Sequence, residues 1–297
     1  MLRSLAVVAA ALAGVGTTAS PHVVKTVRVG GQPTWLAWGA GSIWVANYGS
    51  GSVERVDPRR NRVTARIKTG TQPYAVSFGA GSIWVSSFDS PLVLRLDPRT
   101  NRIVTRIDVG APMLAGITAT PGAVWANVYG AGTVVRIDPA TNAVVARIAV
   151  GGNPEDAIVY GGSVWVPNEN GTLARIDPAT NTVVAKVRVG ADPDNAVACR
   201  GKIWTSSLRG PNLVVVDPAT NRVAKRVGVG TGSVGFACGR ELWTALYGNG
   251  LLLRLDPAKG KVTARVPVGV QPRAVLLAAG AVWVANQASG TVSRLSG

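Results

Sequence analysis

Carboxylate side chains gather in one stretch of this otherwise basic chain. Six of the fifteen acidic residues belong to a recurring Asp-Pro dipeptide, and five of the other nine are Glu155, Asp156, Glu169, Asp192 and Asp194. The chain as a whole is strongly basic, with 31 lysine and arginine residues and a formal net charge of +16, so this local group of carboxylates stands out. Clustered carboxylates bind hard cations such as Ca²⁺ or Mg²⁺, or the cationic group of a ligand. Glu155, Asp156 and Asp194 are therefore candidate metal ligands, with turn capping and pairing with arginine as the alternative.

Motifs for other kinds of catalysis are missing from the sequence. Its one histidine is His22, near the N-terminus. A histidine triad, a zinc cluster or a histidine general base is therefore excluded from the rest of the chain. No Gly-x-Ser-x-Gly, Cys-x-x-Cys or phosphate-loop motif occurs. We therefore expect binding rather than catalysis, although acid–base work by Glu155 or Asp156 stays open.

A unit repeated seven times must position these side chains. It is marked by tryptophans spaced 39 to 41 residues apart, at Trp44, Trp84, Trp125, Trp165, Trp204, Trp243 and Trp283. Asp-Pro recurs in step at Asp57, Asp97, Asp138, Asp177, Asp217 and Asp256. In the first unit, apolar or alternating runs at 33–39, 42–47, 52–56 and 62–68 are separated by Gly, Pro, Asn and Asp, which predicts four antiparallel strands. Seven such units predict an all-β, seven-bladed β-propeller.

Two details of the repeat predict local geometry. The Asp-Pro turns end at Asn61, Asn101, Asn142, Asn181, Asn221 or Gly260, and because Asn and Gly tolerate positive φ, we expect a left-handed residue there. The last unit stops at 294–297, after its third strand, while 23–30 match the fourth strands of other units. We therefore expect the N-terminal strand to complete the seventh blade and close the ring.

Two rows of equivalent positions differ between units while the strands and turns hardly change. The residue that opens each first strand reads Thr34, Tyr74, Met113, Glu155, Asp194, Ser233 and Arg273, and the next reads Trp35, Ala75, Leu114, Asp156, Asn195, Val234 and Ala274. Two extra residues in the third unit make its alignment ambiguous. In a propeller these positions surround the axis on one face. The predicted binding residues are Trp35, Tyr74, Glu155, Asp156, Glu169, Asp194, Asn195 and Arg273.

Residues 1–19 lie outside the repeat and have a secretory signal pattern. Arg3 supplies a basic start, 5–15 are apolar, and 17–19 are small. The apolar stretch is shorter than the roughly 20 residues that span a membrane. We expect a signal peptide at 1–19 and one propeller domain at 20–297, secreted or held in the cell envelope, with an uncleaved anchor as the alternative.

Cys199 and Cys238 each lie five residues before the tryptophan of their unit. They therefore occupy equivalent places on neighbouring blades, and an exported protein meets oxidising conditions. Two interpretations stay open: the cysteines form a disulfide, or they are a pair of small buried residues.

Much of the positive charge is periodic. One row, in the third strands, is Arg55, Arg95, Arg136, Arg175, Arg254 and Arg294, and another, in the outermost strands, is Arg66, Arg106, Arg147, Lys186, Arg226 and Arg265. We expect both rows on the rim, either as a solvated edge or as a surface that attracts polyanions. Charge spread evenly around a ring lacks the aromatic-lined track that single-stranded nucleic acid uses, so no specific nucleic-acid binding is expected.

The segments 44–47 (WVAN), 165–168 (WVPN) and 283–286 (WVAN), each followed by a loop and, in the first two, by a variant of Val-x-Arg-Ile-Asp-Pro-Ala-Thr-Asn, resemble the YVTN family of β-propeller repeats. Tryptophan stands where that motif has tyrosine. The resemblance covers the whole chain after residue 19 and implies an exported binding or interaction protein.

The Ile-Trp and Arg-Ile-Asp-Pro pattern is also similar to the streptogramin (virginiamycin B) lyases, propellers that use histidines and a glutamate around magnesium. The blades here carry no histidine, so those catalytic residues are not carried over. Gluconolactonase-like propellers use a Glu/Asn/Asp metal site, which Glu155, Asn195 and Asp194 could imitate without a motif match.

Together these observations predict an exported, monomeric, non-catalytic propeller that binds a protein, a cell-wall component or a small ligand on its variable face. One alternative is a metal-dependent lyase or lactonase that uses the acidic cluster. The other is a cell-wall protein that binds polyanions through its arginine-rich rim.

Overall fold

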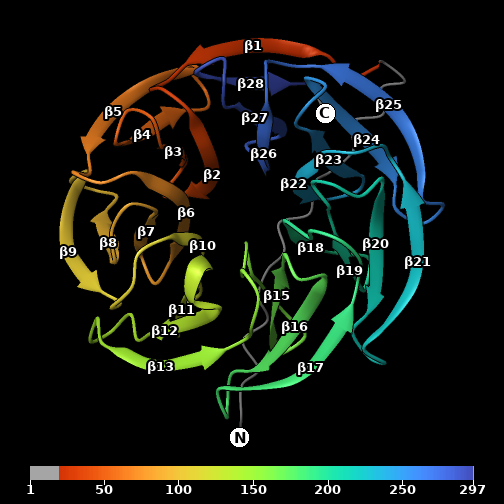
Figure 1. Cartoon of the computed structure of the whole chain (residues 1–297). Helices are drawn as coiled ribbons and strands as arrows, with labels where there is room; N and C mark the ends of the chain where they lie inside the picture. The colour runs from red at the N-terminus through yellow and green to blue at the C-terminus, as the bar shows by residue number, and fades with distance from the viewer. Residues whose placement is uncertain (1–19, 297) are drawn as a thin grey trace, which may run out of the picture.

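The computed structural model describes residues 20–296, which form seven four-stranded antiparallel sheets arranged in a ring (Figure 1). This confirms the predicted all-β, seven-bladed propeller. The strand β1 (Val23–Arg28) pairs with β28 (Thr291–Leu295), so the N-terminal strand completes the last blade, as predicted. The signal peptide expected at 1–19 lies outside the described residues. Among the residues described, no helix is long and apolar enough to cross a membrane.

The blades follow one another along the chain. Blade 1 comprises β2 (Pro33–Gly39), β3 (Ser42–Asn47), β4 (Ser52–Asp57) and β5 (Arg62–Lys68). Blade 2 comprises β6 (Pro73–Gly79), β7 (Ser82–Ser87), β8 (Leu92–Asp97) and β9 (Arg102–Asp108). Blade 3 comprises β10 (Leu114–Ala119), β11 (Val124–Val128), β12 (Thr133–Ile137) and β13 (Val144–Ala149), with the short 3₁₀ helix η1 (Tyr129–Ala131) after β11. Blade 4 comprises β14 (Ile158–Tyr160), β15 (Ser163–Asn168), β16 (Thr172–Asp177) and β17 (Thr182–Arg188).

The remaining blades have the same order. Blade 5 comprises β18 (Ala196–Cys199), β19 (Lys202–Thr205), β20 (Asn212–Asp217) and β21 (Arg222–Gly228). Blade 6 comprises β22 (Ser233–Cys238), β23 (Leu242–Leu246), β24 (Leu251–Asp256) and β25 (Lys261–Pro267). Blade 7 comprises β26 (Pro272–Ala278), β27 (Ala281–Asn286), β28 and β1. The first strands surround the axis and the fourth strands form the periphery (Figure 1).

The position of a strand within its blade decides its burial pattern. Every residue of the second strand β3 is buried, because neighbouring blades cover both of its faces. The peripheral strand β5 alternates exposed residues with half-buried ones and the buried Ile67, so one of its faces is toward solvent. The antiparallel order also defines two faces of the ring. The loop face carries the connections from fourth to first and from second to third strands, and the turn face carries the remaining turns.

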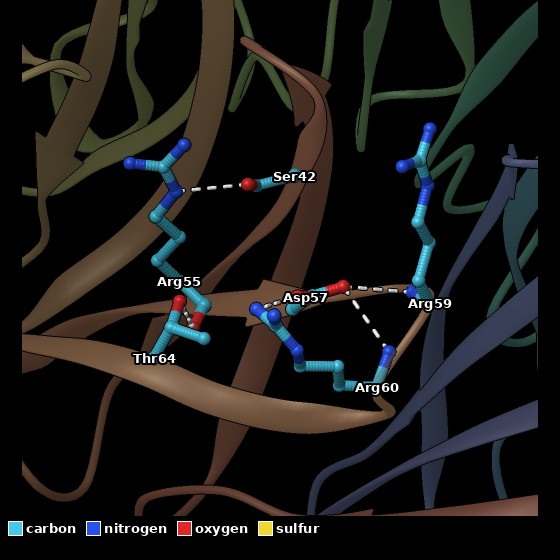
Figure 2. A network of polar contacts seen from close by, with 6 residues as sticks. All are labelled: Ser42, Arg55, Asp57, Arg59, Arg60 and Thr64. Carbon is cyan, nitrogen blue, oxygen red and sulfur yellow. Dashed lines mark hydrogen bonds and ion pairs between the residues drawn. The ribbon is translucent and has the colours of Figure 1, made fainter.

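The aspartate side chain closes each Asp-Pro turn on the turn face. The Asp57 carboxylate accepts hydrogen bonds from the peptide N–H groups of Arg59 and Arg60, at 2.8 and 3.1 Å (Figure 2). These bonds lower the pKa of Asp57, because they stabilise its charged form. The terminal residues of the turns have φ between 51° and 67°, at Asn61, Asn101, Asn142, Asn181, Asn221 and Gly260. The left-handed conformation expected from the sequence is therefore confirmed.

The third-strand arginines join neighbouring blades. Arg55 lies over the ring of Trp44, its cross-strand partner, at 5.3 Å from the centroid. Its Nε donates to Ser42, and its Nη1 donates to Pro98 O at 2.8 Å and Asn101 Oδ1 at 3.2 Å in the next blade. The equivalent stacking and inter-blade bonds are made by Arg95, Arg136, Arg175 and Arg294. We refer to this set as the inter-blade arginine contact.

The placement of the third-strand arginines on a solvated rim is therefore wrong, because all six are half-buried and all but Arg254 hold one blade to the next. The outermost row, which includes Arg66 and Arg106, is exposed as expected. The polyanion hypothesis thus loses half of the charge on which it relied.

Two joints depart from the pattern. In blade 5, Val215 stands opposite Trp204, and Lys225 takes the role of the arginine from the adjacent strand. Its Nζ lies 5.3 Å from the Trp204 ring centroid and 3.2 Å from the Ala258 carbonyl oxygen of blade 6. At the joint between blades 6 and 7, Arg254 pairs with Glu241 of its own blade at 3.5 Å, since blade 7 has no Asp-Pro turn to receive it.

The joint between blades 5 and 6 also carries a covalent link. Cys199 and Cys238 form a disulfide, with Cα atoms 5.6 Å apart, where β18 and β22 end near the axis. Of the two readings left open by the sequence, the structure contains the bonded one.

Candidate functional site

The residues that open the first strands meet around the axis on the loop face. In blade 1, Ala37 pairs with Trp44, and Thr34 lies three residues before Ala37. In blade 3, Thr118 pairs with Trp125, so the equivalent of Thr34 is Ala115 and not Met113. In the sixth unit Ala237 pairs with Trp243, so the same criterion places Val234 in the first variable row in place of Ser233. The row in the structure is Thr34, Tyr74, Ala115, Glu155, Asp194, Val234 and Arg273. The extra length of the third unit lies before the strand and does not alter its register.

Arg273 and Tyr74 face each other across the ring, although they are 199 residues apart in the sequence. The Arg273 guanidinium lies over the Tyr74 ring at 5.2 Å from the centroid and donates Nη2–H to the phenol oxygen. Its Nη2 is also 3.9 Å from Asp194 Oδ1. The side chains of Arg273 and Asp194 are only 14% and 13% exposed, so this ion pair is shielded from solvent.

Three carboxyl groups share this environment with one guanidinium. Burial and the neighbouring Asp194 raise the pKa of Asp156 to about 8, against the opposing effect of Arg273. Burial also raises the pKa of Glu155 well above its ordinary value, and Asp194 adds to this effect. The pKa of Asp194 is raised by burial and lowered in part by Arg273. The cluster therefore retains protons at neutral pH that ordinary surface carboxyl groups lose.

Blade 3 makes room for Asp156 with a glycine. A Cβ on Gly116 would lie 2.7 Å from the Asp156 Cα and 2.5 Å from its Oδ1. Gly116 occupies the second variable row beside Ala115, where blade 1 has Trp35. The missing side chain in one blade thus allows the carboxylate of the next to approach the axis.

A second acidic group lies farther out on blades 4 and 5. Glu169 Oε2 accepts hydrogen bonds from the Tyr129 hydroxyl at 2.5 Å and from Asn153 Nδ2 at 2.9 Å. Burial and Glu169 raise the pKa of Asp192, while Arg209, 3.2 Å away, opposes the rise. The five acidic residues singled out by the sequence therefore form two groups on one face.

The other two predicted binding residues have partly structural roles. Trp35 is half-buried and packs against the hydrophobic cores at the blade 7–1 and blade 1–2 joints. Asn195 is buried, and its peptide N–H donates to Ser206 Oγ at 3.0 Å. Its side-chain Nδ2 has no hydrogen-bond partner among the described residues. An unpaired buried amide next to Asp194 represents unused hydrogen-bonding capacity at the site.

The structure adds a row of aromatic residues that the sequence reasoning missed. The residue four positions after each repeat tryptophan reads Tyr48, Phe88, Tyr129, Glu169, Leu208, Tyr247 and Gln287. Phe88 stacks on Tyr74 with centroids 5.3 Å apart, and Tyr48 approaches Tyr74 edge-on at 6.4 Å. Alignment of the repeats on their tryptophans would have found this row, since it varies as much as the first strands do. The site therefore has an aromatic side at blades 1 and 2 and an acidic side at blades 4 and 5.

The acidic cluster does not have the arrangement of a metal centre. Among residues 20–296, no three histidine, cysteine, aspartate or glutamate side chains converge closely enough to hold one ion. The guanidinium of Arg273 already approaches Asp194, one of the three expected ligands. Metal binding by Glu155, Asp156 and Asp194 thus stays a prediction without geometric support, and we derive no metal chemistry from it.

Comparison with known proteins identifies the class but not the activity. A family described as "Repeat of unknown function (DUF6923)" matches residues 78–195. No curated protein sequence matches the chain. Among solved structures, a chain of the hydrazine synthase of Kuenenia stuttgartiensis is similar, with a TM-score of 0.79, 19% sequence identity, and coverage of 94% of this chain and 97% of that one. At this identity the likeness establishes the fold alone. The repeat match and the seven blades support a β-propeller repeat family.

Proposed function

We propose that this protein is an exported, non-catalytic propeller of the YVTN repeat type that binds a ligand or partner at the loop-face end of its axis. One observation carries the proposal. The positions where the repeats differ most bring Tyr74, Glu155, Asp156, Asp194 and Arg273 together in a shielded cluster, which the repeated fold does not require. Export is the part of the proposal that relies on the signal pattern at 1–19.

The charges favour a ligand with a cationic group next to an apolar or aromatic part. Three carboxyl groups face one guanidinium, so a second cation would pair with a carboxylate that Arg273 leaves free. The rings of Tyr48, Tyr74 and Phe88 would contact the apolar part of the ligand.

Proton release makes this binding dependent on pH. Since the pKa of Asp156 is about 8, the group carries a proton at pH 7, and an incoming cation must displace it. The affinity for a cation therefore rises as the pH increases through 8. A ligand that bound the protonated cluster as a hydrogen-bond acceptor would show the opposite dependence.

Isothermal titration calorimetry with arginine ethyl ester and spermidine, at pH 6.5 and 9, tests the proposal on the chain from residue 20. We expect tighter binding at pH 9, with at least a tenfold loss in Asp156→Asn, which removes a charged partner worth about 1.5–3 kcal/mol. Asp108→Asn, on an exposed peripheral strand, is the matched control and should bind normally.

Three outcomes would contradict the proposal. These are no binding of either cation, equal loss in the Asp108→Asn control, or succinate binding as well as the amines do. A saturable rise in melting temperature with Ca²⁺ or Mg²⁺ that Asp156→Ala abolishes would instead favour the metal-dependent alternative.

A further inference from the structure

A cavity of about 890 Å³ lies on the turn face, where blades 7, 1 and 2 meet. Its lining includes Trp38, Ser42, Arg55, Arg59 and Arg294. Figure 2 shows the blade 1 side, where the side chains of Arg55 and Arg59 extend in the same direction on either side of Ser42. The loop-face cluster lies at the opposite end of the blades, so this cavity is independent of it.

Arg59 contributes a guanidinium without a counter-ion. Asp57, its neighbour, accepts the two peptide N–H groups of the turn and pairs with Arg60 Nη1 at 3.2 Å. In blade 2, Thr100 replaces Arg60, and there the guanidinium of Arg99 approaches its own aspartate at 3.7 Å. The Arg-Arg pair of blade 1 thus leaves the Arg59 guanidinium with no ion pair among the described residues.

Arg294 also lines the cavity and contributes positive charge. Both of its inter-blade hydrogen bonds use Nη1, toward Pro58 O and Asn61 Oδ1. Its Nε has no partner among residues 20–296, whereas the equivalent Nε of Arg55 donates to Ser42. The difference arises because Ala281 occupies the position of that serine.

Trp38 gives the cavity an apolar wall. The residue is 40% exposed, and its repeat equivalents include Phe78, at 37%, and the smaller residues Ala119, Ala198 and Cys238. An exposed indole beside the uncommitted guanidinium of Arg59 is complementary to a planar ring that carries negative charge.

We propose that this cavity is a second binding site, which takes a small organic anion with an aromatic ring. The ring packs against Trp38, and the carboxylate or phosphate accepts hydrogen bonds from Arg59, with the positive field of Arg55 and Arg294 behind it. Three arginines and one aspartate line the cavity, and the carboxylate of that aspartate is already taken by the turn.

Titration calorimetry with phenyl phosphate and phenylacetate on the chain from residue 20 tests this site and separates the two anions. We expect binding of at least one of them, with Arg59→Gln at least tenfold weaker and Trp38→Ala several-fold weaker. The repeats supply matched controls, since Arg99→Gln and Phe78→Ala change the same residues of blade 2 and should alter affinity less than twofold. All four side chains are exposed, so we expect unchanged folding by circular dichroism.

Further probes make each outcome decisive. Inorganic phosphate and benzylamine should each bind much more weakly than the aromatic anions, because each lacks one of the two recognised features. Binding of inorganic phosphate at equal strength, equal losses in the blade 2 controls, or no binding of either aromatic anion up to about 10 mM would overturn the proposal. Asp194→Asn should leave this binding unchanged, which separates failure here from failure at the axis.

Discussion

The joints between blades and the axial cluster of the loop face use arginine and aspartate in opposite ways. At the joint between blades 1 and 2, Arg55 directs its donors to its own blade and the next. In the Asp-Pro turn of blade 1, peptide N–H groups lower the pKa of the half-buried Asp57. At the axis, Arg273 is shielded and its Nε has no partner among the described residues. There the pKa of Asp156 is raised to about 8 by burial.

The comparison distinguishes polar contacts that recur at the joints of the fold from polar groups that occur in one blade only. A repeated contact is satisfied because each unit supplies both donor and acceptor at fixed positions. A residue present in one unit has no such prearranged partner, so its polar groups remain partly unpaired. Unpaired buried polar groups cost stability, and those of Arg273 and Asn195 lie at the candidate site.

The largest expected effects are at the joints. Arg95→Ala removes the stacking on Trp84 and the hydrogen bonds to Ser82, Pro139 O and Asn142 Oδ1, and should lower the free energy of unfolding by about 3 kcal/mol. Guanidinium-chloride denaturation measures this loss. Arg106→Ala, in the exposed peripheral row, is the control and should cost less than about 0.5 kcal/mol. Similar losses in both variants would remove the distinction between the two rows.

The disulfide at the blade 5–6 joint should have a comparable effect. It closes a 39-residue separation, so in the chain-entropy description Cys199→Ala/Cys238→Ala lowers the free energy of unfolding by about 4 kcal/mol. A matched measurement on wild type with and without reductant should give the same loss. If the double variant is as stable as the oxidised protein, the disulfide does not compensate for the missing arginine of this joint.

Changes of pH should affect the two regions in opposite directions. A folded pKa near 8, above the ordinary aspartate value of about 4, makes the Asp156 contribution complete below pH 4 and lost as the pH rises through 8. The melting temperature of Asp156→Asn should therefore exceed that of wild type by several degrees more at pH 8.5 than at pH 5.

Asp138, whose pKa is lowered by the N–H of Ala140, contributes stability above pH 4 that is lost on acidification. Asp138→Asn is thus destabilising at pH 7 and nearly neutral near pH 3, and thermal melts across this range reveal any departure from these signs.

The smallest effect concerns the lysine that replaces an arginine. Lys225→Ala should cost about 1 kcal/mol, since a single ammonium makes weaker contacts with Trp204 and blade 6. Adding Val215→Arg to this variant restores the residue of the other joints and should recover the loss in denaturant melts. Failure to recover would show that Gly260, in place of asparagine, leaves too few acceptors for an arginine.

The sequence predicted more of the blades than of the site. The left-handed Asn61, the ring closure by β1 and the gathering of Tyr74, Glu155, Asp156, Asp194 and Arg273 on one face all follow from the repeat. The role of Arg55 does not, because its acceptors lie in the next unit, 43 and 46 residues away. Alignment on the tryptophans would have shown the row of Tyr48 and Phe88, but only the structure shows that both rings pack against Tyr74, Tyr48 from blade 1 and Phe88 within blade 2.

What the sequence alone determined is the repeating element: a four-stranded blade whose period, turns and apolar alternation are local properties of about forty consecutive residues. Only the tertiary structure decided which polar groups of one blade meet those of another. These contacts raise the pKa of Asp156 and place the third-strand arginines at the joints between blades. They also leave Arg59 and Arg273 with donors that have no partner among the described residues. Electrostatic and hydrogen-bonding properties depend on distances through space, which a linear spacing of residues does not specify.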